Sequence, residues 1–235
     1  AGPRTAITVT VNNAPNVFIN GGNTASCASK TVALAAGGAT TYTWSTSQTA
    51  VNIVVTPSIT TTYTVIGTGA NTCTNSAVKI ITVNPSPTLT VTGNNVLCAG
   101  NATTLTVSGA NTYTWAAGFF VPTIGVSPSA TTNYSVIGKD ANNCVDTVAY
   151  LVTVNQLPVL NVSSTNTILC SGQTATISVT GAVSYTWSDN SNGSDLVVNP
   201  TANSNYTVTG VDANNCSNSA VFTQSVSTCT AIEEQ

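Results

Sequence analysis

Seven cysteines at regular intervals constrain the fold more than any other feature of this sequence. Six of them form three pairs whose members are 46 residues apart: Cys27 and Cys73, Cys98 and Cys144, and Cys170 and Cys216. Four other landmarks follow the first cysteine of each pair at constant offsets: Trp44, Trp115 and Trp187; Pro57, Pro128 and Pro200; Tyr63, Tyr134 and Tyr206; and Gly67, Gly138 and Gly210. Such regularity indicates internal repeats, so the chain contains three copies of one unit.

Proline-containing segments mark the boundaries of the copies. They are Asn84-Pro85-Ser86-Pro87 and Asn155-Gln156-Leu157-Pro158. Proline restricts itself and its predecessor to extended geometry, which makes these linkers short and stiff. We assign residues 14–84, 85–156 and 157–229 to the three repeats, residues 1–13 to an isolated N-terminal strand, and residues 230–235 to a C-terminal tail. Stiff linkers in series predict an elongated molecule.

Apolar residues alternate with small polar ones throughout each copy. In the second copy the alternating pairs include Leu105 and Val107, Ile124 and Val126, and Val152 and Val154. This period of two is typical of half-buried antiparallel strands. Six or seven short strands per copy predict an all-β fold of three tandem β-sandwiches. The three tryptophans are expected in the cores, and Tyr63, Tyr134 and Tyr206 as tyrosine corners.

The cysteine spacing predicts one disulfide inside each sandwich. Such a bond closes a loop of 46 residues and stabilises a small domain by roughly 3 to 4 kcal/mol in the chain-entropy model. Three regular disulfides indicate an oxidising compartment outside the cytosol. Cys229 remains as the odd cysteine, and the sequence leaves open whether it is an isolated surface thiol or an intermolecular bond.

Short motifs recur at the ends of the copies. Cys98-Ala99-Gly100, Tyr113-Thr114-Trp115 and Asp140-Ala141-Asn142-Asn143-Cys144 of the second copy return in the third as Cys170-Ser171-Gly172, Tyr185-Thr186-Trp187 and Asp212-Ala213-Asn214-Asn215-Cys216. Together they resemble the immunoglobulin-like or PKD-like repeats of secreted and cell-surface proteins of Bacteroidota. The segment from Cys229 to Glu234 resembles the junction before a type IX secretion sorting domain, which implies export to the cell surface.

The composition excludes much chemistry. The chain has no His, so neither a Ser-His-Asp triad nor a His-bearing zinc site can form. Four Lys and Arg residues neutralise few phosphates, which argues against nucleic acid as a partner. No apolar run is long enough for a transmembrane helix. We therefore expect no enzyme, cofactor, metal site or membrane insertion.

Carboxylates and an acceptor threonine provide weaker candidate sites. Asp140 and Asp212 precede asparagines in loops, which favours turns and leaves a calcium site as the alternative. Asp189 and Asp195 flank a polar turn, where solvated carboxylates are expected rather than a catalytic pair. Asp146-Thr147-Val148 resembles a Bacteroidota O-glycosylation motif, in which Thr147 would be the acceptor.

The N-terminal segment carries the main candidate contact. Residues 6–12 resemble the last strand of a copy and present an apolar stripe of Ile7, Val9 and Val11. The segment is either the remnant of a longer array or a strand donated to a neighbouring subunit. Phe119 and Phe120 lie in a loop and form a second candidate contact, with packing onto their own domain as the alternative.

These features predict a non-enzymatic extracellular structural protein, a subunit of a cell-surface filament assembled head-to-tail through the N-terminal strand. The expected partners are other copies of the chain. Two alternatives stay open: a stalk or adhesin segment of a larger surface protein that contacts other cells, and an accessory module that binds surface glycans.

Overall fold

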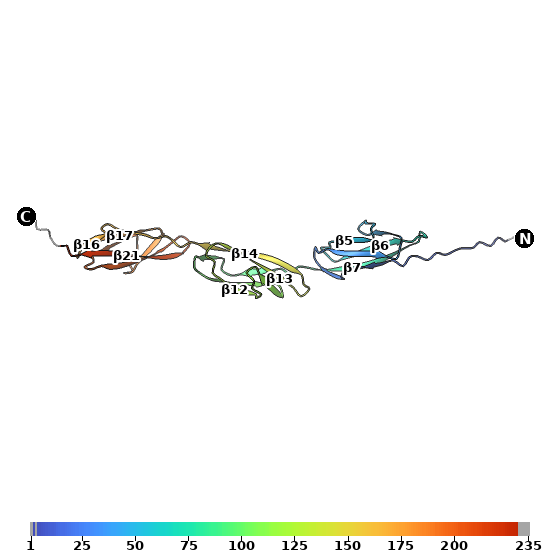
Figure 1. Ribbon diagram of the computed structural model, residues 1–235, viewed down its shortest axis with the longest axis horizontal. Helices are drawn as coiled ribbons and strands as arrows, with labels where there is room; N and C mark the ends of the chain where they lie inside the picture. The colour runs from blue at the N-terminus through green and yellow to red at the C-terminus, as the bar shows by residue number, and fades with distance from the viewer. Residues whose placement is uncertain (1, 3, 230–235) are drawn as a thin grey trace, which may run out of the picture. The chain divides into compact units, whose positions relative to one another are not determined.

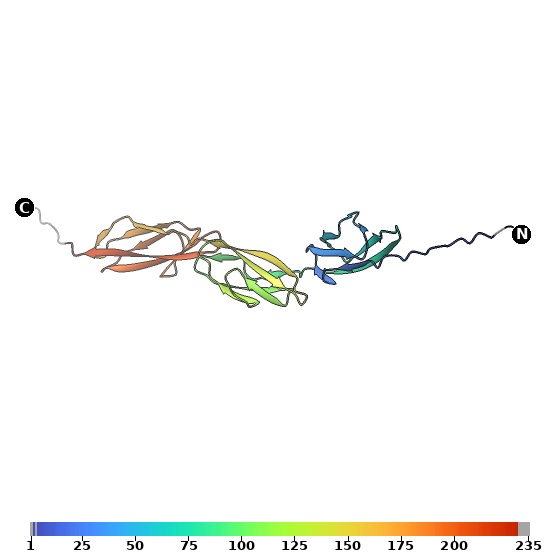
Figure 2. The ribbon, with the colours of Figure 1, turned by 45° about the vertical axis from the view of Figure 1, so that its right-hand side comes forward.

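The computed structural model describes residues 2 and 4–229, and these contain 21 β-strands and no helix (Figures 1 and 2). The predicted all-β fold of three tandem sandwich-like domains is confirmed. Within the described residues there is no helix long and apolar enough to cross a membrane.

Each repeat contributes seven strands. The first repeat has β1 (Phe18–Asn20), β2 (Ala25–Cys27), β3 (Val32–Gly37), β4 (Thr41–Trp44), β5 (Asn52–Val55), β6 (Thr61–Thr68) and β7 (Thr74–Asn84). The second has β8 (Thr90–Thr92), β9 (Val96–Cys98), β10 (Thr103–Ser108), β11 (Thr112–Trp115), β12 (Thr123–Val126), β13 (Thr132–Lys139) and β14 (Val145–Asn155). The third has β15 (Asn161–Ser164), β16 (Ile168–Cys170), β17 (Ala175–Thr180), β18 (Ser184–Trp187), β19 (Asp195–Val198), β20 (Ser204–Val211) and β21 (Ser217–Ser227).

The same topology recurs in every repeat. One sheet has three strands, in the orders β1-β3-β5, β8-β10-β12 and β15-β17-β19. The other has four, in the orders β2-β7-β6-β4, β9-β14-β13-β11 and β16-β21-β20-β18. The short second strand pairs in parallel with the long last strand, whereas the neighbouring pairs such as β3 with β5 and β6 with β7 are antiparallel. Two such sheets, of three and four strands, match the seven-stranded immunoglobulin-like sandwich.

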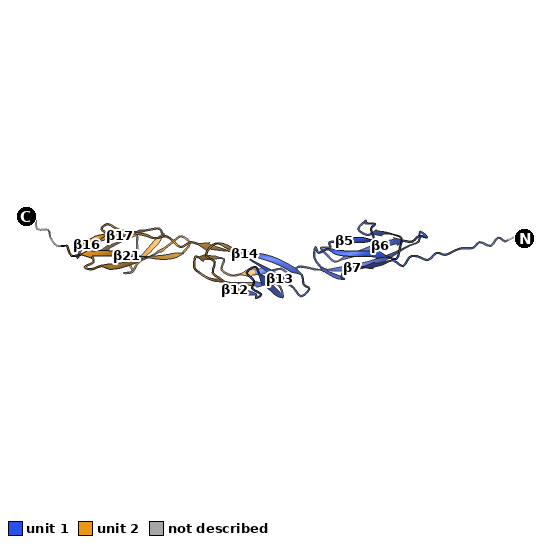
Figure 3. Ribbon diagram, in the orientation of Figure 1, with its two compact units in different colours: residues 1–90, 107–122, 135–148 blue, residues 91–106, 123–134, 149–235 orange. Residues whose placement is uncertain are grey.

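The chain divides into two compact units whose boundary falls within the second repeat (Figure 3). Unit 1 contains residues 1–90, 107–122 and 135–148. Unit 2 contains residues 91–106, 123–134 and 149–235.

The three recurrent tryptophans are buried, which confirms their predicted core position. Each pairs across strands with a fully buried valine: Trp44 with Val65, Trp115 with Val136, and Trp187 with Val208. The indole N–H groups donate to the carbonyl oxygens of Ala50, Val121 and Gly193 at 2.9, 3.0 and 3.0 Å. The polar atom of each large ring is therefore paired, as burial requires.

The tyrosine that ties a turn to its strand is not the expected one. The hydroxyls of Tyr42, Tyr113 and Tyr185 each donate to the carbonyl oxygen, and accept from the N–H, of the alanine three residues earlier. Tyr63, expected as a tyrosine corner, instead packs in the core of the first repeat. The tie therefore lies at the start of the tryptophan strand.

Candidate functional site at the cysteine-bearing ends of the repeats

The structure contains the expected number of three disulfides, but their partners differ from the prediction. Two bonds join consecutive repeats, Cys27–Cys144 and Cys98–Cys216, each with a Cα–Cα distance of 5.5 Å. The third, Cys170–Cys229, joins the third repeat to the segment after β21. All seven cysteines lie in the described residues, and Cys73 is the free one. The predicted bonds inside each repeat, and the prediction of Cys229 as the odd cysteine, are therefore wrong.

Strand length explains why the two cysteines of one repeat do not meet. Cys73 immediately precedes β7, whereas Cys27 is paired with Asn84 at the far end of that strand. Strands rise about 3.3 Å per residue, so the eleven residues of β7 separate the two positions by roughly 36 Å. A disulfide requires Cα atoms about 5.5 Å apart. The last strands of the other repeats, β14 and β21, also have eleven residues.

The first cysteine of each repeat is held in one constant geometry. It ends a short strand that runs parallel to the end of the last strand, in the pairs Cys27 with Asn84, Cys98 with Asn155, and Cys170 with Ser227. A turn follows immediately, in which the residue two positions later, Ser29, Gly100 or Gly172, has a positive φ. We call this end of a repeat the first-cysteine end.

The second cysteine closes a tight turn at the opposite end of the sandwich. In the second repeat Asp140 donates its N–H to the Cys144 carbonyl oxygen at 2.9 Å. Its carboxylate oxygen Oδ1 accepts from the N–H groups of Asn142 and Cys144, both at 2.8 Å. Asp212 makes the same bonds in the third repeat. These carboxylates build the turn, and no group of three or more His, Cys, Asp or Glu gathers among the described residues.

The corresponding turn of the first repeat is built differently. Gly69 replaces the aspartate, and its N–H still donates to the Cys73 carbonyl oxygen at 2.9 Å. The Asn71 side chain performs the capping, because its Oδ1 accepts from the Cys73 N–H at 3.2 Å. Its Nδ2 donates to the Asn13 carbonyl oxygen at 3.0 Å. The turn therefore presents Cys73 without a neighbouring carboxylate and ties it to the N-terminal segment.

Cys73 occupies the same kind of surroundings as Cys144. The Cys144 Sγ lies 3.8 Å from the carbonyl oxygen of Asn84, the last residue of the preceding repeat's β7. The Cys73 Sγ lies 3.8 Å from the carbonyl oxygen of Asn12. Asn12 is the residue that the sequence comparison aligns with Asn84. The N-terminal segment thus stands beside Cys73 as a last strand stands beside Cys144.

The N-terminal segment is contacted by Asn71 and Cys73 but pairs with no strand within the described residues. Residues 4–17 belong to none of the strands. Ile7, Val9 and Val11 are 86%, 79% and 84% exposed. The segment therefore presents an apolar stripe to solvent, and its role as a contact remains a prediction.

The other candidate residues are accessible but are not brought together. Phe119 and Phe120 are 51% and 77% exposed in their loop, which argues against the alternative that they pack onto their own domain. Thr147 is exposed on β14, and its glycosylation remains a prediction. The type IX junction was predicted on the segment from Cys229 to Glu234, of which residues 230–234 lie outside the described residues.

Asp189 and Asp195 each belong to a local hydrogen-bond network. The Ser191 hydroxyl and then its backbone N–H, both donating to Asp189 Oδ1, hold the pKa of this carboxyl below its ordinary value. Asp195 Oδ1 accepts from the Ser178 hydroxyl at 2.6 Å. Both carboxylates are exposed, in line with the predicted solvated turn, and each also accepts local hydrogen bonds that the sequence did not predict.

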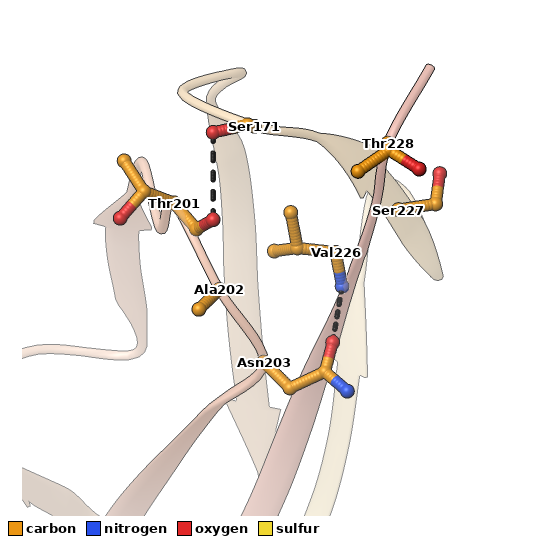
Figure 4. A pocket seen from close by; sticks show the side chains of 7 residues that line it. All are labelled: Ser171, Thr201, Ala202, Asn203, Val226, Ser227 and Thr228. Atoms are coloured by element: carbon orange, nitrogen blue, oxygen red, sulfur yellow. Dashed lines mark hydrogen bonds between the residues drawn. The ribbon is translucent and has the colours of Figure 1, made fainter. Parts of the chain in front are cut away.

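A hollow of about 550 Å³ opens at the first-cysteine end of the third repeat (Figure 4). It adjoins Cys170 through Ser171 and borders the segment that leads to Cys229. At its floor the Val226 N–H donates to Asn203 Oδ1 at 2.7 Å. The residues that line it are Ser171, Thr201, Ala202, Asn203, Val226, Ser227 and Thr228. These side chains are small, and none carries a charge.

One structural residue was missed by the sequence reasoning. Gln224 on β21 is fully buried at the position that Ile81 and Val152 occupy in the other repeats. Its Oε1 accepts from the Ser164 hydroxyl at 2.9 Å, and its Nε2 donates to the carbonyl oxygens of Asn166 and Thr167. The alignment of the three repeats would have revealed a polar residue in an otherwise apolar core position.

Comparison with known proteins places the chain in no family. No family model matches it, and no curated protein matches it. Among solved structures, a bacterial ice-binding adhesin aligns at 14% identity with a TM-score of 0.32, over 93% of this chain and 100% of that one. An outer capsid protein of bacteriophage RB49 aligns at 12% identity and a TM-score of 0.33, over 92% and 100% of the two chains. An I-band fragment of titin aligns at 11% identity and a TM-score of 0.37, over 92% and 100%. Likenesses this distant support no argument about function, and the fold assignment rests on the sheet topology.

Proposed function

We propose that this chain is a non-enzymatic extracellular structural protein, a subunit that assembles head-to-tail into a cell-surface filament. The observation that carries the proposal is the pattern of disulfides between consecutive repeats. Two adjacent sandwiches are joined both by a proline linker and by a covalent bond between their ends. Such double connection is expected in a protein that resists tension and proteolysis rather than in one that turns over a substrate.

The same bonds support an extracellular location, because disulfides form and persist in oxidising compartments. Export by type IX secretion in a member of the Bacteroidota is the route that the sequence resemblance implies. This export route is part of the proposal.

The proposed joint between subunits is the N-terminal segment. Ile7, Val9 and Val11 are exposed on one face of an extended stretch that pairs with no strand among the described residues. An extended peptide with an apolar stripe can add to the open edge of a neighbouring sheet. A contact between two different ends of a subunit does not close on itself and generates a filament.

Negative-stain electron microscopy of the purified, unreduced chain tests this proposal. We expect uniform fibres from the unaltered chain and none after deletion of residues 1–13. Replacement of Ile7, Val9 and Val11 by serine should have the same effect. Replacement of Thr8 and Thr10 by serine, on the opposite face of the segment, is the matched control and should leave the fibres intact. Fibres of normal length from the deleted chain would contradict the proposal.

The exposure of Phe119 and Phe120 favours a second candidate function, that of a stalk or adhesin segment. Two adjacent exposed aromatic side chains in a loop are suited to contact with another surface. Separate short rods in the microscope, together with loss of cell-surface binding in a Phe119→Ser/Phe120→Ser variant, would support this candidate.

A further inference from the structure

We propose that Cys73 forms a disulfide with Cys170 of a second copy of this chain, and that it does so by displacing Cys229. This inference rests on the head-to-tail assembly proposed above and specifies its covalent joint. The joint would reproduce between molecules the bond that already connects consecutive repeats within one molecule.

The first support is the rule that the two inter-repeat bonds obey. In each, the second cysteine of one repeat is bonded to the first cysteine of the repeat before it, Cys144 to Cys27 and Cys216 to Cys98. Cys73 is the second cysteine of the first repeat and is free. Its turn has the same hydrogen bond between its first and last residues, Gly69 N–H to the Cys73 carbonyl oxygen. The thiol is therefore presented in the way that its two bonded counterparts are.

The second support is the contact of Cys73 with the N-terminal segment. The distance from Cys73 Sγ to the Asn12 carbonyl oxygen equals that from Cys144 Sγ to the Asn84 carbonyl oxygen, 3.8 Å. Asn84 also accepts a hydrogen bond from Ala28, the neighbour of Cys27, at 3.1 Å. Cys73 thus faces a backbone carbonyl oxygen as a bonded second cysteine does, and what it lacks is the first cysteine itself.

Cys170 is the first cysteine that a second copy can offer. Cys27 and Cys98 are bonded to Cys144 and Cys216, which are fully buried. Cys170 is bonded to Cys229, which lies two residues beyond β21 and is exposed. The backbone geometry at Cys170 is that of the other first cysteines, because it pairs with Ser227 as Cys27 pairs with Asn84. The hollow lined by Ser171 and Thr228 lies beside Cys170 and Cys229 (Figure 4).

The reaction is a thiol–disulfide exchange. The Cys73 thiolate attacks Sγ of Cys170 in the second copy, and a bond forms between these two sulfurs while the Cys170–Cys229 bond breaks. Cys229 leaves as a thiolate and takes up the proton that Cys73 lost. One disulfide is consumed and one is formed, so the step needs no oxidant. The first-repeat turn carries Gly69 where the others carry a carboxylate, so the repulsion that such a charge would exert on a thiolate is absent.

The test is to concentrate the unreduced chain at mildly alkaline pH, block free thiols with N-ethylmaleimide, and separate the products without reductant. We expect a ladder of multimers that collapses on reduction, and a maleimide label that moves from Cys73 to Cys229 as the ladder grows. Trypsin should then give a product in which 31–79 of one copy is bonded to 140–235 of another, and that 140–235 peptide still carries 5–30 and 80–139 through Cys144 and Cys216. Cleavage at aspartates should place the bond on Cys170, which lies between Asp146 and Asp189, rather than on Cys229.

Two variants complete the test. Cys73→Ser should abolish the ladder. Cys229→Ser leaves Cys170 as a thiol, so the ladder should then form only when oxidised glutathione is added. A chain that stays monomeric with Cys73 labelled, or that yields only dimers bonded through two Cys73 residues, would overturn the inference.

Microscopy separates this inference from the proposed function. Fibres formed equally well by Cys73→Ser would overturn the covalent joint and leave the filament proposal standing. Covalent multimers that build no fibre would uphold the joint and contradict the filament.

Discussion

At the scale of single residues, the turn after the third strand of each repeat requires glycine. Gly38, Gly109 and Gly181 have φ values of 87°, 103° and 108°. A Cβ atom at these positions would lie 1.8 to 1.9 Å from the carbonyl oxygens of Asn16, Thr88 and Val159. The left-handed conformation and the close backbone approach both exclude a side chain.

Gly181→Ala is therefore expected to destabilise the third repeat by at least about 2 kcal/mol, since backbone strain and a steric clash combine. Gly172→Ala is the matched control, because Gly172 also has a positive φ, of 74°, but a Cβ there meets nothing within 4 Å. The control should lose only about 1 kcal/mol. Urea denaturation followed by circular dichroism measures the free energy of unfolding of both variants. Equal losses in the two variants would show that the close backbone contact with Val159 adds no destabilisation.

Asp189 gives the residue-scale prediction for pH. The hydrogen bonds from Ser191 hold its pKa in the folded state below the ordinary value. A depressed pKa adds stability above the ordinary value of about 4, and this contribution is lost as the pH falls through the folded-state pKa. An NMR titration should give a midpoint for Asp189 below that of an ordinary aspartate. Ser191→Ala should raise it, and Ser194→Ala should leave it unchanged. An unchanged midpoint in Ser191→Ala would contradict the assignment.

At the scale of strands and sheets, the sequence predicted what is local and missed what depends on strand length. The alternation of apolar residues correctly predicted strands around Leu105, Trp115 and Val152, because a period of two records directly which face of a strand is buried. The equal spacing within each cysteine pair suggested bonds inside the repeat. That inference failed because one uninterrupted eleven-residue strand, such as β7, separates the paired positions.

The candidate site was predictable only in part for the same reason. The apolar stripe of residues 6–12 could be found from its likeness to the last strand of a repeat. The role proposed for Cys73 could not be found from the sequence, because it depends on which end of a sandwich carries each cysteine. Gln224 was missed because its side chain satisfies backbone carbonyls of a loop distant in sequence.

The inter-repeat bond Cys27–Cys144 should contribute strongly to stability. It spans a sequence separation of 117 residues, for which the chain-entropy model gives roughly 5 kcal/mol. A Cys27→Ala/Cys144→Ala variant should therefore unfold at markedly lower urea concentration than the unaltered chain. Cys73→Ala, which breaks no bond, is the control and should change stability by less than about 0.5 kcal/mol. A large loss of stability in the Cys73→Ala control would point to a bond at Cys73, such as Cys27–Cys73, instead.

At the scale of the whole molecule, two disulfides cross-link consecutive sandwiches that the polypeptide chain already joins. A repeat of about 70 residues has a small core for its surface. Here each repeat is bonded to a neighbouring repeat, and the third is also closed by Cys170–Cys229. The two ends of the series differ chemically, since one carries the free thiol of Cys73 and the other carries Cys170 held by Cys229. This polarity is what head-to-tail assembly requires.

The central claim is the pairing of cysteines between repeats, and non-reducing tryptic mapping of the thiol-blocked, denatured monomer tests it most directly. The four basic residues Arg4, Lys30, Lys79 and Lys139 divide the cysteines among four peptides. We expect peptides 5–30 and 80–139 both to stay bonded to 140–235, and peptide 31–79 to be released alone with Cys73 blocked. A peptide 31–79 bonded to 5–30 would place Cys27 with Cys73 and contradict the account.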